Sequence, residues 1–130
     1  MNREIKFRIW DVGNKEMLEV QELDFEPTFY GGRIAIRPDQ YSDYFDTEEM
    51  ILMQYTGLHD KNGKEIYEGD IVRIIVNNNI EKICKVEFKN GIFGVMFSKN
   101  KDLTAFPHFC NTTFEIIGNE YDNPELLGGE

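Results

Sequence analysis

Two turn signals stand close together in the middle of the chain, between runs of residues that favour β-strands. The dipeptide Asn62-Gly63 tolerates positive φ at both central positions of a turn, so it predicts a type I′ hairpin. Further along, Gly69 permits a backbone bend and Asp70 is suited to accept hydrogen bonds from nearby amides. An apolar run follows directly. The stretch 53–72 therefore predicts antiparallel β-structure with tight turns, and it indicates structure rather than chemistry.

The second half of the chain continues in short apolar runs separated by asparagine and glycine. Asn77 to Asn79 and Asn90-Gly91 are strong turn signals between these runs. Five strands are expected, at residues 64–67, 71–76, 80–88, 92–98 and 114–117. Because full closure leaves no exposed strand edge, this pattern favours a small SH3-like barrel over residues 53–118. The overall fold class is then mainly β, a β-rich α+β protein.

The first half predicts a smaller and more irregular β lobe over residues 1–52, and residues 119–130 form a tail. Apolar and basic residues alternate over 5–9, which predicts a half-buried strand, and further strands are expected at 17–20 and 33–36. Residues 46–56 leave two alternatives. Asp46 begins a sequence that can cap one helical turn, but a strand from Met50 to Thr56 is favoured.

Charge is distributed unevenly along the 130 residues, whose net charge is −10. Residues 11–50 carry eleven acidic and three basic side chains, whereas residues 51–117 carry eight of each. A surface that binds duplex nucleic acid is normally basic, so bulk charge disfavours that function. No apolar run is long enough to span a bilayer. We expect a soluble, cytoplasmic protein without a membrane partner.

Groups with potential chemistry are present, but none of them forms a recognised catalytic pattern. Cys84 and Cys110 lack metal-ligand spacing, and His108 beside Cys110 has no matching partner. Four carboxylates follow His59 closely and are of the type that holds Mg²⁺ or acts as acid and base: Asp60, Glu65, Glu68 and Asp70. Turn building explains them better, because aspartate is favoured at such positions. We predict no catalytic residue, no cofactor and no metal. A metal-dependent enzyme using residues 60–70 and a nucleic-acid-binding barrel remain the two alternatives.

Aromatic residues in the acidic part of the chain are the better functional clue. They either form a second small core or provide a contact surface in which acids select a basic partner. The tail has the same acidic and apolar character. The candidate interaction surface consists of Phe29, Tyr30, Tyr41, Tyr44, Phe45, Tyr121, Leu126 and Leu127, and Phe25 lies in the same segment.

Three segments in the right order resemble the YopX family of phage and prophage proteins: residues 6–11, 55–72 and 114–127. The positions that build its central motif here are Gly57, Asn62, Gly63, Gly69 and Asp70. The resemblance implies an accessory protein that works in the cytoplasm of a bacterial host, and it implies no catalytic role for any residue. The expected function is a non-catalytic module that binds a protein partner or assembles with itself as a homo-oligomer.

Overall fold

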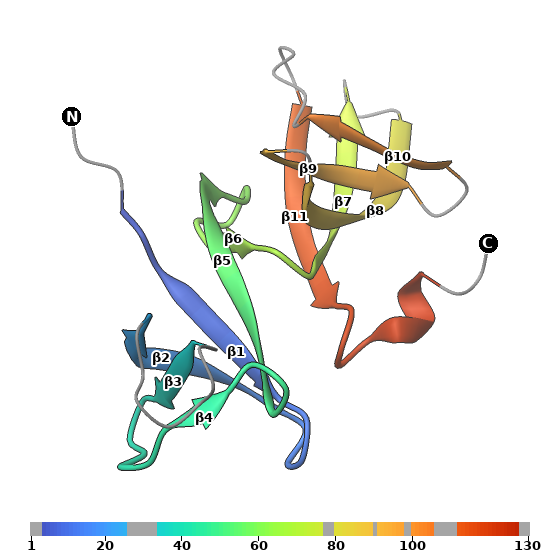
Figure 1. Ribbon diagram of the computed structural model, residues 1–130. Coiled ribbons are helices and arrows are strands. Elements are labelled where there is room, and N and C mark those ends of the chain that lie inside the picture. The colour runs from blue at the N-terminus through green and yellow to red at the C-terminus, as the bar shows by residue number, and fades with distance from the viewer. Residues whose placement is uncertain are drawn as a thin grey trace. The chain divides into compact units, whose positions relative to one another are not determined.

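The computed structural model describes residues 4–25, 34–76, 80–89, 91–97, 100–105 and 112–127. The chain divides into two compact units, residues 1–54 and residues 55–130. Each unit is built from antiparallel strands (Figure 1), and the helical structure of the described residues is one short 3-10 turn, η1 (Pro124–Leu126), with no α-helix. The prediction of a mainly β protein is therefore confirmed. In the part of the chain described above, no helix has the length and hydropathy needed to cross a bilayer.

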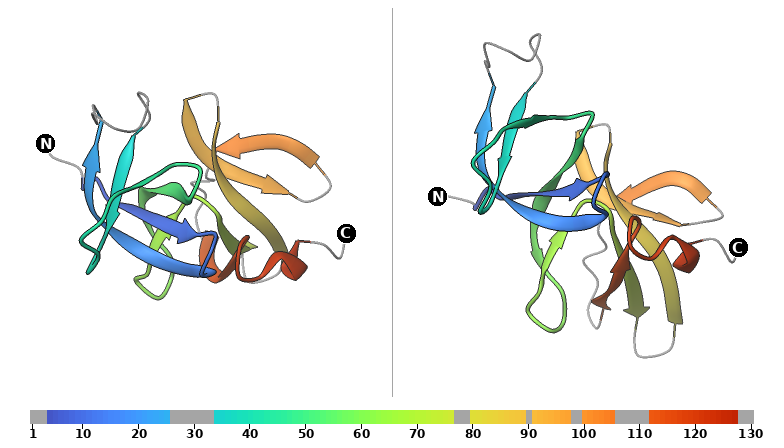
Figure 2. Two further views of the ribbon diagram at one scale, coloured as in Figure 1. Left: turned by 60° about the horizontal axis from the view of Figure 1, so that its bottom comes forward. Right: turned by 90° about the horizontal axis from the view of Figure 1, so that it is seen from below.

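The first unit contains a sheet in the order β4-β3-β2-β1-β5. Its strands are β1 (Phe7–Asp11), β2 (Glu16–Asp24), β3 (Ala35–Pro38), β4 (Phe45–Asp46) and the first half of β5 (Met50–His59). The pairing of β2 with β3 is irregular between Val20 and Glu22, and β2 bends along its length (Figure 2). One strand can thereby pair with β1 at its start and with β3 at its end.

The core of the first unit follows from the apolar residues of these strands. Ile9, Ile36 and Met50 are buried together, and the half-buried residues packed against them are Leu18, Val20, Leu23, Ile34, Phe45 and Leu52. The strand expected at residues 5–9 begins two residues later, and Ile5 is 60% exposed. Residues 50–56 belong to β5, so the favoured strand is confirmed over the helical alternative.

The second unit contains a five-stranded sheet in the order β10-β9-β8-β7-β11. Its strands are β7 (Asp70–Val76), β8 (Ile80–Lys89), β9 (Ile92–Phe97), β10 (Asn100–Ala105) and β11 (Thr112–Asn119). Four of the five strands expected from the sequence lie here, and β10 was not expected. The edge strands β10 and β11 do not pair with each other among the described residues, so the expected barrel closure is not found.

The strand β8 joins two offset ladders, and this explains its curvature in Figure 2. Residues 80–85 pair with β7, while residues 84–89 pair with β9. A strand shared in this way must twist between its two partners, because neighbouring strands in a sheet are rotated relative to one another. The sheet therefore curls around one buried face without closing.

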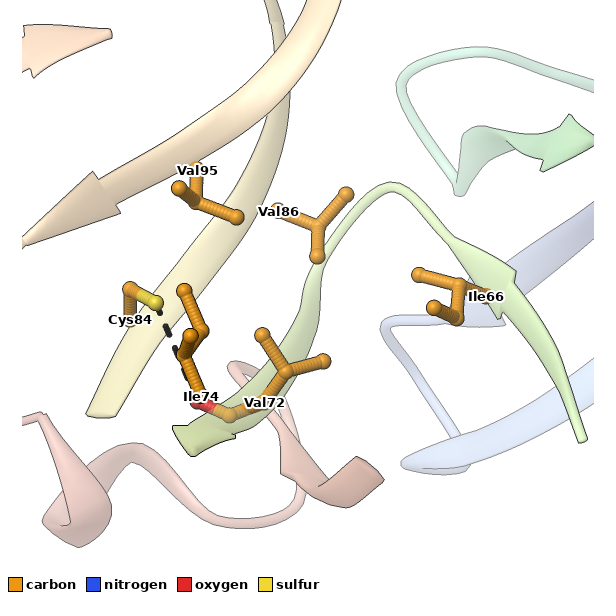
Figure 3. Packing of buried hydrophobic residues seen from close by; sticks show 6 residues of the cluster. All are labelled: Ile66, Val72, Ile74, Cys84, Val86 and Val95. Carbon is orange, nitrogen blue, oxygen red and sulfur yellow. Dashed lines mark hydrogen bonds between the residues drawn. The ribbon is translucent and has the colours of Figure 1, made fainter. Parts of the chain in front are cut away.

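That buried face is filled by small branched side chains from several strands (Figure 3). The buried members are Ile66, Val72, Ile74, Cys84, Val86 and Val95, with Leu58, Phe93, Phe114 and Ile116 packed against them. Cys84 is fully buried and behaves as a small hydrophobe. Its Sγ lies 3.9 Å from the Val72 carbonyl oxygen, and burial raises the pKa of its thiol to about 12.

The second half of β5 and β6 (Glu65–Tyr67) form a hairpin that contributes to this core. Leu58 comes from β5 and Ile66 from β6, and both contact the cluster of buried residues in the five-stranded sheet. Since Ile66 is fully buried, the hairpin is an integral part of the second unit. Its turn also makes hydrogen bonds with β11.

Candidate functional site

The turn of the β5–β6 hairpin differs from the expected type I′ turn. The Gly63 amide donates a hydrogen bond to the Asp60 carbonyl oxygen at 3.0 Å, and the Asp60 amide donates to the Lys64 carbonyl oxygen at 2.8 Å. Gly63 has φ of 83°, but Asn62 does not have positive φ; of the described residues other than glycine, only Lys15 and Gln40 do. Residues 60–63 therefore form a type I turn, followed by Gly63 in the left-handed conformation.

The side chain of Asp60 explains why this turn is preferred. Its Oδ1 accepts hydrogen bonds from the amides of Asn62 at 2.8 Å and Lys64 at 2.9 Å. These two bonds hold the loop around the carboxylate, as aspartate commonly does in turns. A type I′ turn would need positive φ at Asn62 as well. The local sequence therefore indicated a hairpin correctly, but the Asp60 side chain selects another turn type.

The same carboxylate also reaches a distant strand. Asp60 Oδ2 accepts a hydrogen bond from the Ile116 amide at 3.0 Å, and the Lys61 amide donates to the Phe114 carbonyl oxygen at 2.8 Å. Two backbone groups on the outer edge of β11 are satisfied in this way. An open sheet edge can pair with another chain, and residues 60–61 occupy part of this one. Sequence analysis gave no signal for the long-range bond.

The electrostatic state of Asp60 follows from its surroundings. Its residue is only 7% exposed, and burial disfavours the charged form. The amides of Ile116, Lys64 and Asn62 outweigh that effect and, with the charge of Lys64, lower the pKa of the carboxyl group. Asp60 is therefore an ionised acceptor at neutral pH. A carboxylate whose lone pairs already face backbone amides is poorly suited to act as a general base.

The strand β5 carries a bulge beside this turn. Its pairing with β6 is irregular between Tyr55 and His59, and Gly57 has φ of 89°. The Thr56 hydroxyl donates to the Ile66 carbonyl oxygen at 2.7 Å and accepts from the Leu58 amide at 3.1 Å. This side chain replaces ladder bonds that the bulge interrupts. Gly57 thus belongs to the motif because the backbone needs a left-handed conformation there.

Gly69 and Asp70 connect β6, β8 and the segment after β11. Gly69 has φ of 87°, its amide donates to the Val86 carbonyl oxygen at 2.9 Å, and its carbonyl accepts from the Glu120 amide at 2.8 Å. Asp70 is buried, and its Oδ2 accepts from the Tyr67 amide at 2.8 Å. Both positions therefore serve the backbone.

The carboxylates considered for metal or acid–base chemistry do not form a metal-binding group. Asp60 and Asp70 are each occupied by backbone amides, and Glu65 and Glu68 are half-buried with partners of their own. Among the described residues, no three His, Cys, Asp or Glu side chains gather where a metal ion could be held. His108 and Cys110 lie outside the described residues.

Charged side chains of the second unit form two groups of ion pairs, one around Glu115 and one around Lys85. Arg73 pairs with Glu115, and the Lys61 Nζ lies 3.8 Å from Glu115 Oε1. The Lys85 Nζ lies 2.8 Å from Glu87 Oε2 and 3.5 Å from Glu120 Oε1. The hydrogen bond from Arg73 lowers the pKa of the Glu115 carboxyl group. In each pair the opposite charges offset one another, and because these side chains remain partly accessible to water the pairs add little stability.

The aromatic residues of the first unit fall into two groups. Phe45 packs on the core, and Tyr41 meets its ring edge-on with the ring centres 5.9 Å apart. Tyr44, by contrast, is 37% exposed, and Phe25 is 64% exposed. Phe29 and Tyr30 lie outside the described residues. The acidic segment therefore supplies both part of a core and an exposed aromatic surface.

A charged pair fixes the loop that presents Tyr44. Arg37 Nε donates to Glu22 Oε1 at 2.7 Å, and Arg37 Nη1 donates to the Tyr41 carbonyl oxygen at 2.9 Å. Hydrogen bonds from Arg37 and then Tyr44 lower the pKa of the Glu22 carboxyl group. The exposed acids on the same segment are Asp39, Asp43, Glu48 and Glu49. This acidic aromatic surface is thus held by side chains of β2 and β3.

The tail forms a compact loop after β11. Asn119 Oδ1 accepts from the amides of Tyr121 and Asp122, and Asn123 Oδ1 accepts from the Asn119 amide at 3.2 Å. A Cβ at Gly118 would lie 2.5 Å from Asn123 Oδ1, so the loop needs glycine there. The η1 turn (Pro124–Leu126) follows. Tyr121, Leu126 and Leu127 are half-buried, and their docking on folded protein stays a prediction.

Comparison with known proteins finds a family model and a curated relative that match this chain. The family model described as YopX protein matches residues 6–128. The SPbeta prophage-derived uncharacterized protein YopX of Bacillus subtilis (strain 168) is 41% identical over 71 residues, which cover 52% of this chain and 53% of the relative. The aligned part thus spans about half of that curated relative.

Two solved structures resemble the whole chain. Protein EF1440 from Enterococcus faecalis is 29% identical, with 97% of this chain and 99% of that chain covered and a TM-score of 0.62. Protein yopX from Bacillus subtilis is 25% identical, with 96% and 97% covered and a TM-score of 0.64. Because the family model covers nearly the entire sequence, the chain belongs to the YopX family.

Proposed function

We propose that this chain is a prophage-derived accessory protein that acts in the host cytoplasm as a non-catalytic protein-binding module. Support for the prophage origin comes from its similarity to the SPbeta prophage-derived relative. The polar groups of the central motif are used to build turns, which favours binding over catalysis. In the second unit, the strand order and the shared strand β8 support an SH3-like arrangement of residues 53–118.

The exposed aromatic and acidic surface around Tyr44 is the observation that carries this proposal. Tyrosine supplies a large contact area at low entropic cost, and aromatic residues are enriched at protein interfaces. The surrounding carboxylates of Asp39, Asp43 and Glu48 would attract a basic partner and repel nucleic acid. Because Arg37 holds the loop to Glu22 and Tyr41, the surface is organised before a partner arrives.

A charge reversal on this surface tests the proposal. The immobilised full-length chain is used to capture proteins from a host that carries the prophage, at a series of salt concentrations. Asp43→Lys should reduce capture of a basic partner, because it places a repulsive charge beside Tyr44. Glu125→Lys makes the same change in charge at an exposed position of the tail, so it is the matched control and should leave capture intact.

Two results would contradict the proposed surface. Equal loss with both variants would indicate a general effect of net charge, and retention with both would place the contact elsewhere. The partner could also be a second copy of the chain. Light scattering of the wild-type chain over a range of concentrations distinguishes such a homo-oligomer from binding to a different protein. A mass that grows with concentration and returns to the monomer value in Asp43→Lys would identify the partner as a second copy.

A further inference from the structure

The tip of the β5–β6 hairpin carries a dipeptide with covalent chemistry of its own. In an asparagine followed by glycine, the main-chain nitrogen of the glycine can attack the side-chain carbonyl carbon of the asparagine. Asn62 and Gly63 are both exposed, and apart from Gly63 and its two chain neighbours no residue has an atom within 4 Å of the place where a Cβ at Gly63 would stand. Asparagine is among the thermally labile residues of proteins, and this pair is sterically open to reaction.

The reaction balances without an oxidant or a cofactor. A bond forms between Gly63 N and Asn62 Cγ, and the Gly63 nitrogen gives its proton to water or hydroxide. The bond between Asn62 Cγ and Nδ2 breaks, and the side-chain NH2 group takes up a proton from water and leaves as ammonia. The product is a five-membered succinimide. Water then opens one of its two carbonyl groups and yields either aspartate or isoaspartate at position 62.

The turn opposes this chemistry in the folded protein. The attacking nitrogen of Gly63 donates a hydrogen bond to the Asp60 carbonyl oxygen at 3.0 Å, and the Asn62 amide donates one to Asp60 Oδ1 at 2.8 Å. A type I turn also holds ψ of its third residue, here Asn62, near about 0°. Ring closure requires rotation about that bond and loss of the Gly63 hydrogen bond. The nucleophile is therefore present but held away from reaction.

We propose that Asn62 is a self-modification site that the Asp60 turn keeps closed, so that deamidation proceeds only through local opening of the hairpin. The isoaspartyl product adds one carbon to the main chain inside the loop that Asp60 organises. The bonds from Gly63 and Lys64 to Asp60 cannot all re-form in that longer loop. Because Asp60 also holds the Ile116 amide, modification would release the hairpin from β11 irreversibly.

The rate of deamidation in folded and unfolded protein tests the proposal. The full chain is incubated at mildly alkaline pH, with and without urea, and peptide mass spectrometry follows the conversion of amide to acid at Asn62. We expect the folded chain to react at least about tenfold more slowly, since a local opening free energy of about 1.4 kcal/mol already gives that factor. Equal rates in the two conditions would overturn the proposal.

The sequence offers an internal calibration. Lys61-Asn62-Gly63 and Lys89-Asn90-Gly91 are identical tripeptides, so in urea both asparagines should react at the same rate. If Asn62 were slower than Asn90 in urea, its slow reaction would be intrinsic and the proposed protection by the turn would be rejected. Asn62→Gln should abolish the signal at position 62, because the longer side chain does not close the five-membered ring readily.

Loosening the turn provides the second test. In Asp60→Ala, kept below its own melting temperature as followed by circular dichroism, the rate at Asn62 should rise toward the rate in urea. An unchanged rate in the folded variant would reject the role given to Asp60. Where this variant does not fold, wild-type chain separated into modified and unmodified fractions decides the outcome. The isoaspartyl fraction should melt at a lower temperature, and equal melting would contradict the proposed release of the hairpin.

Discussion

Asp11 in the first unit and Asp60 in the second are both buried aspartates at hairpin turns, yet their hydrogen bonds differ in reach. Among the residues that the structure describes, the Asp11 carboxylate binds its own turn alone, through the amides of Gly13 and Asn14 and the side chain of Asn14. Asp60 binds its turn and also the amide of Ile116, 56 residues away. The same residue type at the same kind of position therefore serves a local turn in one unit and joins two distant strands in the other.

The difference in reach predicts a large difference in stability. Asp60→Ala removes the acceptor of three backbone amides. Asn62 and Lys64 are exposed, so water can partly replace their acceptor, but Ile116 is half-buried and its amide left unpaired costs about 1–3 kcal/mol. We expect the free energy of unfolding to fall by about 2 kcal/mol or more. Asp11→Ala should cost about 1 kcal/mol, because Gly13 and Asn14 are exposed and water can replace the lost acceptor. Urea unfolding of both variants measures the comparison, and equal losses would break it.

A second prediction concerns the end of β11, which Asp60 holds at its middle. In Gly118→Ala the new Cβ would approach Asn123 Oδ1 to 2.5 Å, so the tail loop must shift. We expect a loss of about 1–3 kcal/mol, as for other overpacked positions. The double variant Gly118→Ala with Asn123→Ala should recover part of it in thermal unfolding. A neutral single variant would show that the tail loop adapts freely.

A third prediction concerns Gly69, which connects β6 to β8 and to the segment after β11 through its backbone and not through a side chain. Its φ of 87° is rarely adopted by other residues, so Gly69→Val should destabilise the protein by more than about 1 kcal/mol. Asp70→Asn should have a milder effect, since asparagine can still accept the bond from the Tyr67 amide. Melting temperatures measure both variants. Equal and large losses would point instead to an essential charge at Asp70.

The lowered pKa of Asp60 predicts acid sensitivity of the second unit. A carboxyl group with a depressed pKa in the folded state contributes stability that is present above its unfolded value, near 3.8. That contribution is lost as the pH falls through the folded value, by at most about 1.4 kcal/mol per pH unit for one proton. Unfolding of wild type and Asp60→Asn between neutral and acidic pH should show a flatter profile for the variant. Parallel profiles would argue against the charged form of Asp60.

The smallest expected effect is that of divalent cations. Since backbone amides occupy the carboxylates of Asp60 and Asp70, millimolar Mg²⁺ or Mn²⁺ should leave the unfolding midpoint almost unchanged. A specific ion at 100 times its dissociation constant would stabilise the protein by about 2.7 kcal/mol. A shift of that size, absent from Asp70→Ala, would show that these carboxylates serve a metal in addition to the backbone.

Local signals in the sequence predicted most of the strands in the described part of the chain. Apolar alternation and asparagine–glycine turns located β7, β8 and β9 to within a residue or two. The strand β10 was missed, because its sequence, Asn100–Ala105, lacks an apolar alternation. The expected barrel closure was wrong for a related reason. Closure depends on how the two edge strands meet, and no short segment of sequence reports that.

The candidate surface shows the same division between local and distant information. The sequence indicated an acidic segment rich in aromatic residues, but it did not separate Phe45, which packs in the core, from Tyr44, which is exposed. The two residues are adjacent, but Phe45 belongs to the short β4 strand and packs on the core, whereas Tyr44 precedes that strand. Composition alone does not distinguish the two positions.

The sequence by itself determined the mainly β character, the positions of the turns and the family, because these depend on residues close together in the chain. Tertiary structure alone decided the type of turn at Asn62 and the open curl of the five-stranded sheet. It also decided the long-range role of Asp60. The physical reason is that a carboxylate accepts hydrogen bonds from any amide that folding brings within about 3 Å, whatever its distance along the chain. For Asp60, one of those amides belongs to Ile116.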